Sequence, residues 1–220
     1  MKHIHLFLLV FVAWCAPLSA WKGTEANGDR PIFYGTLKSR ESNTFSVTNV
    51  TVGRSTTSHD KIMLYEMPKE LKSAQDKVIK QNPHEDLTTS QLELLKIKKI
   101  EVPEPQVMYK WFDPESKRTT PVAQEFIELI ITWRSGSTIH YLLQLGQEDS
   151  KRQVKVYCDV LDKPVQGVMQ DGTLFCPGID KTDLRKKGAP FPSIQVLELE
   201  EPCFKVPTEN VGTMKKNTNN

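Results

Sequence analysis

Histidine and cysteine have the most direct claim to chemistry in this sequence, and both are scarce. Beyond the first twenty residues the histidines are His59, His84 and His140. A Ser/His/Asp or Cys/His centre needs a histidine held by a third group, and no serine lies in a Gly-x-Ser-x-Gly context. His140 falls on the more polar side of a strand pattern, where we expect a surface residue. The sequence therefore predicts no nucleophilic catalysis.

Acidic residues and histidines also occur together in the types that metal sites and acid/base catalysis use. His59 and His84 each stand beside acidic residues, but both lie in polar loops without the ligand spacing of zinc or calcium sites. Glu125 and Glu128 have opposite parity, so on an extended strand their side chains point to opposite faces and cannot flank one substrate bond. We therefore expect a protein that is not an enzyme and that holds no metal or cofactor.

The cysteines that follow the first twenty residues are Cys158, Cys176 and Cys203. In an oxidising compartment, an odd number predicts one bridge with a leftover thiol, or a bridge to another chain. Cys158 ends a strand pattern and Cys176 lies in the next hairpin, so we take Cys158–Cys176 as the candidate disulfide. Cys176–Cys203 is the alternative, because the spacing alone does not decide between them.

The most legible element is the stretch 125–145, with the sequence EFIELIITWRSGSTIHYLLQL. Apolar residues occupy the odd positions of 127–133 and of 139–145, the period-two pattern of two strands with one buried face. A three-residue turn with Gly136 in the left-handed conformation keeps the two apolar faces together, whereas a two-residue turn would not. This hairpin predicts three cross-strand pairs: Ile131 with Ile139, Leu129 with Tyr141, and Ile127 with Leu143.

Shorter apolar patterns surround this hairpin. They predict strands at 31–37, 44–52, 61–66, 97–102, 152–160, 167–170, 173–176 and 193–200. The apolar parity changes near Thr48 or Asn49, which predicts a β-bulge there. Asp171 and Gly172 predict a tight turn between two of the strands.

The remaining segments are more polar. Helical spacing within 68–82 fits an amphipathic helix, and an ordered excursion from the sheet is the alternative. A capping box at 88–91 predicts a second, short helix. The segment 108–121 is predicted to be a loop, and 183–192 a polar connection. The fold class that follows is mainly β, an antiparallel β-sandwich or open barrel with one or two short helices.

Three aromatic residues cluster in the predicted loop, at Tyr109, Trp111 and Phe112. Aromatic side chains are enriched at the centres of protein interfaces, so these three form a candidate interaction surface. The alternative is that the rings close one end of the sheet.

Residues 1–20 have the features of a secretory signal peptide. A lysine precedes a short apolar run at 6–12, and small residues permit cleavage after Ala20. Cys15 would be the lipidated residue of a lipoprotein, but Trp14 stands where that signal has a small residue, so we expect no lipid anchor.

The rest of the chain divides into a single β-rich domain at 21–204 and a disordered polar tail at 205–220. No later run is apolar enough to span a bilayer, so we expect a secreted or periplasmic protein without a transmembrane segment. Asn49 begins an Asn-x-Thr sequon, a possible glycosylation site in a eukaryotic secretory pathway.

The charge and composition of the chain limit the classes of partner that we expect it to bind. The formal net charge of +2 falls to about +1 without Lys2, so no strong field favours nucleic acid. We expect an exported, non-enzymatic β-rich binding module of the cell envelope or extracellular space, whose partner is a protein or another envelope macromolecule. The alternative is a carrier of an apolar small molecule in a β-barrel cavity, with Ile131, Trp133 and Leu143 facing the ligand.

Overall fold

The structure is a computed structural model, and the residues that it describes are 30–54, 61–73, 75–116, 123–146, 153–176 and 185–205. The predicted signal peptide, the tail beyond Lys205, and His59 lie outside these residues. Within the described residues, no helix is both long enough and apolar enough to cross a membrane.

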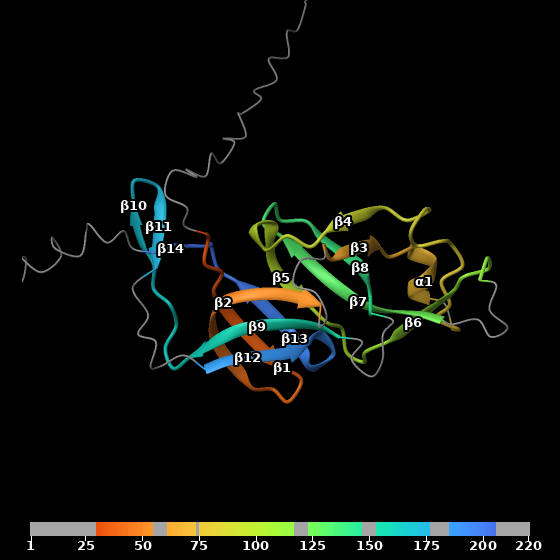
Figure 1. Cartoon of the computed structure of the whole chain (residues 1–220), viewed down its shortest axis with the longest axis horizontal. Helices are drawn as coiled ribbons and strands as arrows, with labels where there is room; N and C mark the ends of the chain where they lie inside the picture. The colour runs from red at the N-terminus through yellow and green to blue at the C-terminus, as the bar shows by residue number, and fades with distance from the viewer. Residues whose placement is uncertain are drawn as a thin grey trace, which may run out of the picture.

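The described chain is mainly β, as predicted, and its principal element is one open sheet (Figure 1). The strand order is β12-β9-β2-β1-β13-β5-β7-β8-β3-β4, with β6 paired to β7, and every pairing is antiparallel. The strands are β1 (Gly35–Ser39), β2 (Thr44–Arg54), β3 (Met63–Glu66), β4 (Thr89–Gln91), β5 (Ile97–Glu101), β6 (Met108–Phe112), β7 (Ala123–Trp133), β8 (Thr138–Gln144), β9 (Val154–Leu161), β12 (Arg185–Pro190) and β13 (Ile194–Leu199).

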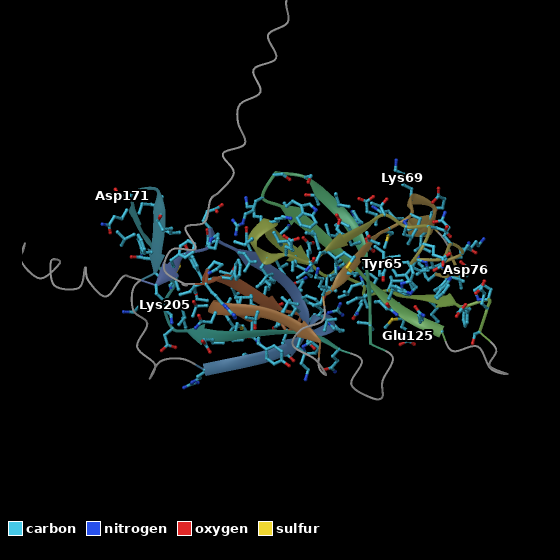
Figure 2. The ribbon with its side chains drawn as sticks, turned by 45° about the horizontal axis from the view of Figure 1, so that its top comes forward. Tyr65, Lys69, Asp76, Glu125, Asp171 and Lys205 are labelled. Carbon is cyan, nitrogen blue, oxygen red and sulfur yellow. A yellow bond between two sulfur atoms is a disulfide. The ribbon has the colours of Figure 1, made fainter. Side chains whose placement is uncertain are left out.

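A second, three-stranded sheet stands at one end of the molecule (Figure 1). Its strands are β10 (Val168–Gln170), β11 (Thr173–Cys176) and β14 (Phe204–Lys205). The turn between β10 and β11 is the predicted one, because Asp171 and Gly172 have φ values of 48° and 78°. Figure 2 shows Asp171 at the tip of this hairpin.

The central hairpin of β7 and β8 is confirmed in its register. Ile131 pairs with Ile139, and the other two predicted pairs form as well. Gly136 has a φ of 94°, and the Trp133 amide donates to the Ser137 carbonyl at 2.8 Å, which closes a three-residue turn. The hydrophobic alternation and the turn glycine were sufficient to set this register.

The large sheet curls around one main hydrophobic core. Strands from both ends of the strand order contribute to it, among them β9 with Val156, β1 with Leu37 and β8 with Leu143. The predicted bulge in β2 helps the curvature, since its register shifts between Thr48 and Thr51.

A second core lies on the opposite face of β7 and β8, contrary to the expectation of one buried face. It contains Phe126, Leu142, Tyr65 and Trp111, and it is covered by the segment 67–87. Figure 2 shows Tyr65 inside the molecule, whereas Lys69 and Asp76 of the covering segment point outward. Both faces of this hairpin are therefore packed.

Of the two alternatives for 68–82, the ordered excursion from the sheet describes most of the segment, and the helix is short. Helix α1 (Lys69–Ser73) is a single short turn of the expected 68–82 helix. Farther along, the backbone of 77–79 pairs with β6, where the Ile79 amide donates to the Lys110 carbonyl at 2.8 Å. This pairing places Ile79 in the second core.

Three other predictions about local structure are wrong. The segment 108–121 was predicted to be a loop but contains β6, and the polar connection 183–192 contains edge strand β12. The short helix after 88–91 is replaced by β4 and a 3₁₀ turn, η2 (Leu94–Lys96). In each case, pairing with a distant strand overrides the local preference of a polar sequence.

Candidate functional site

A cavity of about 350 Å³ lies at one end of the main core, between the β1–β2 hairpin, β9 and β12. The 3₁₀ turn η5 (Phe191–Ser193) and the start of β13 close its remaining side. These strands lie together in the lower part of Figure 1. The apolar part of its lining includes Leu37, Phe45, Val47, Val156, Val160 and Ile194.

Small side chains at inward positions leave this space. Cys158 pairs with Lys187 across β9 and β12, and Val156 pairs with Ala189, so neither pair places a large apolar group against the other strands. The corresponding inward positions of β7 carry isoleucine and leucine. The space is partly open to solvent, a cleft that the side chains of these strands do not fill.

The rim of the cavity carries charged and hydroxyl groups that the β1–β2 turn holds in place. The Ser39 amide donates to the Asn43 carbonyl at 2.9 Å, and the Arg40 amide donates to the Ser193 carbonyl at 3.2 Å. Across the opening, the Lys187 Nζ lies 3.7 Å from the centre of the Phe45 ring, a cation–π contact. The backbone of the turn is thus tied to η5.

Several of these rim groups have no hydrogen-bond partner among the described residues. They are Ser39 Oγ, Arg40 Nε and Arg40 Nη2, each of which is shielded from solvent. The Oε1 atom of Glu104 lies 3.8 Å from Arg40 Nε, which is beyond hydrogen-bond distance. Buried polar atoms without partners are rare in folded proteins, so these three require a physical explanation.

Cys158 contributes a free thiol to the cavity wall. Burial, reinforced by the nearby Asp159, raises the pKa of this thiol to about 11, although Lys187 acts in the opposite direction. The thiol is therefore protonated near neutral pH and is a poor nucleophile. Its role at this site is to line the wall.

The disulfide joins Cys176 to Cys203, with 5.5 Å between their Cα atoms, and the preferred pairing of Cys158 with Cys176 is wrong. The parallel pairing of β11 with β14 brings the two bridged residues together, whereas Cys158 faces the main core. A signal for this was available, since Cys158 shares the inward parity of Val154 and Val156.

The predicted aromatic surface is divided by the alternation of β6. Tyr109 and Trp111 are only 2% and 6% exposed and pack in the second core, so the predicted surface is wrong for both residues. Phe112 points the other way and is 44% exposed. The alternative, that these rings close part of the sheet, describes Tyr109 and Trp111.

Polar groups on the second face form two small clusters. His140 Nδ1 lies 2.5 Å from Glu128 Oε1, and the Tyr109 hydroxyl donates to Glu128 Oε2 at 3.4 Å. Burial, with the adjacent Glu128, raises the pKa of Tyr109 to about 12. His84 lies 3.0 Å from both the Tyr65 hydroxyl and Gln124 Oε1. These contacts tie the covering segment and β6 to the hairpin.

The residues predicted to line a carrier cavity do not line this one. Ile131 and Leu143 are fully buried in the packed part of the main core. Trp133 stacks edge-to-face on Tyr141, with 6.0 Å between the ring centres. The cavity that exists lies instead among β1, β2, β9 and β12, where the facing residues of β9 and β12 are small or polar.

Asn49 is exposed at the bulge of β2, where its φ is 52°. Its amide donates to Asp159 Oδ2 at 2.7 Å. Its exposure is compatible with a sequon, and glycosylation remains a prediction.

Comparisons of the chain with protein family models, with curated proteins and with solved structures find no match. The case for a function therefore rests on the geometry of the cavity and on the chemistry of its lining.

Proposed function

We propose that this protein is an exported, non-enzymatic binding module, and that the cavity beside Val156 holds a small apolar molecule. The observation that carries this proposal is the cavity itself, whose volume of about 350 Å³ lies at the small end of the usual range for ligand sites. Most of its lining is aliphatic or aromatic, which suits an apolar ligand.

Two features of the reactive groups support a binding role over a catalytic one. The only free thiol among the described cysteines, Cys158, is held protonated by burial. His140 and Glu128 are paired with each other beside Tyr109, an acid too weak to donate a proton near neutral pH. Export is supported by the predicted signal peptide, and the Cys176–Cys203 disulfide is compatible with an oxidising compartment.

The test is a titration of the secreted chain with a small fluorescent apolar probe, repeated in a matched pair of variants. Val154 and Val156 are fully buried on the same face of β9, but only Val156 lines the cavity. We expect saturable one-to-one binding that Val156→Leu abolishes and Val154→Leu preserves. Absence of binding to the wild-type chain, or equal binding by all three, would contradict the proposal.

Binding of an envelope protein is a second candidate, favoured by one observation. Met108 and Phe112 are 38% and 44% exposed on the same side of β6, so two large apolar groups are available there. If a partner binds at this strand, Phe112→Ser should weaken its co-purification from the natural host and leave the small-molecule titration unchanged. Co-purification that Phe112→Ser does not alter would exclude this surface.

A further inference from the structure

We propose that the ligand of the cavity is an anionic amphiphile, a short single apolar chain whose negatively charged head is held by Arg40 and Ser39, with Lys187 facing it across the opening. This inference rests on the proposed binding function and adds the chemical class of the ligand. Each part of the ligand has its counterpart in the lining.

Three donor atoms at the rim have no hydrogen-bond acceptor among the described residues. An unsatisfied buried polar group costs about 1–3 kcal/mol, and more if it is charged, yet Ser39 and Arg40 together carry three such atoms. Both residues line the cavity. Adjacent guanidinium nitrogens match the two oxygens of a carboxylate, and hydrogen bonds between charged partners are about twice as strong as neutral ones.

The described carboxylates engage this arginine only loosely. Arg40 Nε forms a long ion pair with Glu104 Oε1 at 3.8 Å, and the Glu104 side chain is about half exposed, so the pair is screened by solvent. Among the described lining residues, Arg40 and Lys187 are cations and Glu41 is an exposed anion, so the lining has a positive balance. An anion therefore complements the rim better than a cation or a neutral head.

Lys187 can also be explained as a residue that protects an edge strand from aggregation. It stands on β12, and an inward-pointing lysine there discourages pairing with another chain. That role requires neither the unpartnered groups of Arg40 and Ser39 nor an apolar cavity beneath the charge. A ligand with an anionic head and an apolar body accounts for all these features together.

The volume of the cavity limits the apolar part. About 350 Å³ is enough for one short chain and too little for a lipid with two long chains. Octanoate and 1-octanol are therefore suitable probes, because they share the same chain and differ in the charge of the head.

The experiment is calorimetric titration of the secreted chain with both probes, in the wild type and in Arg40→Gln, Lys187→Gln and Lys38→Gln. Lys38→Gln is the control, because it removes the same charge from an exposed residue of β1 that does not line the cavity. We expect octanoate to bind about tenfold tighter than 1-octanol. Arg40→Gln should weaken octanoate by about tenfold, Lys187→Gln by about threefold, and neither should change 1-octanol appreciably.

Each outcome of this titration has one meaning. Equal affinities for the two probes in the wild type would overturn the anionic head and leave the apolar site standing. Binding of neither probe would overturn the proposed function as well. A preference for octanoate that survives in both Arg40→Gln and Lys187→Gln would overturn the assigned head site, provided that circular dichroism shows folded variants. Lys38→Gln should match the wild type, and an equal loss there would reduce the effect to net charge.

Discussion

The β7–β8 hairpin and the β9–β12 pair face the same main core, but they fill it differently. On β7, Ile127, Leu129 and Ile131 are fully buried and pair with leucine, tyrosine and isoleucine on β8, in that order. On β9, Val156 and Cys158 meet only Ala189 and the stem of a lysine on β12. Both pairs have correct strand alternation, so the difference lies in the size of the inward side chains.

This difference teaches that burial and packing are separate properties. Val156 is as fully buried as Leu129, yet one lines a cavity and the other does not. The alternation of apolar residues decides which side chains point inward. The volumes of facing side chains decide whether the interior closes, and a ligand site arises where they fall short.

The largest expected difference between the two regions comes from truncation. Leu129→Ala in the packed hairpin should lower the free energy of unfolding by about 2–5 kcal/mol, because it creates a new cavity. Val160→Ala on the wall of the existing cavity should cost about 1 kcal/mol or less, since that side chain is only partly buried. Urea denaturation measures both. Equal losses would erase the proposed contrast.

Alkaline pH tests the burial of two acids, Cys158 on β9 and Tyr109 on β6, the strand that pairs with β7. Burial holds the pKa of Cys158 at about 11, against 9.0, and that of Tyr109 at about 12, against 10.0. Both acids keep their protons more tightly when folded, so the free energy of unfolding should fall as pH rises, from 9 to 11 for the thiol and from 10 to 12 for the phenol.

The variants separate these two contributions. Cys158→Ala should flatten the lower part of the decline, and Tyr109→Phe should flatten the upper part. Denaturation curves at stepped pH values give the slopes directly. A decline that is unchanged in either variant would show that its acid is not held neutral by the fold.

Enlargement of a side chain sharpens the comparison within one strand. Val154→Leu should cost about 1–3 kcal/mol, because Val154 is fully buried and does not line the cavity. Val156→Leu should cost less than about 1 kcal/mol, or should stabilise the chain, because the added methylene enters the cavity. Thermal and urea unfolding measure the difference. A larger cost for Val156→Leu than for Val154→Leu would show that no space is available beside Val156.

The strands that carry their own hydrophobic pattern could be predicted from sequence. The β7–β8 hairpin has strict alternation and a glycine at the position that needs a positive φ, so its register was predicted pair by pair. The bulge near Asn49 was predicted for the same kind of reason, a change in the parity of apolar residues.

The elements that depend on distant partners could not be predicted in this way. β12 begins with three consecutive basic residues and has no apolar alternation, yet its backbone pairs with β9 along its whole length. β6 was difficult to recognise because its aromatic residues face both sides of the sheet. Its backbone pairs with β7 along one edge and with 77–79 along the other. Short charged strands give no local signal that outweighs their resemblance to loops.

The candidate site was the least accessible to sequence analysis. A cavity forms where side chains from several strands together leave space between them. The sequence of any one segment therefore does not reveal it. Ile131 and Leu143, which would face the ligand under the alternative carrier hypothesis, are instead fully buried in the main core. The unpartnered atoms of Ser39 and Arg40 become evident only when the turn is seen against η5.

The most direct test of the central claim is to locate a bound probe by methyl NMR. Octanoate is added to the secreted chain labelled at its isoleucine, leucine and valine methyl groups, and intermolecular NOEs are recorded. We expect NOEs from the octanoate chain to Val47, Val156 and Ile194, and none to Ile127 or Ile131. NOEs to the β7 methyl groups, or no NOEs to Val156 at saturation, would contradict it.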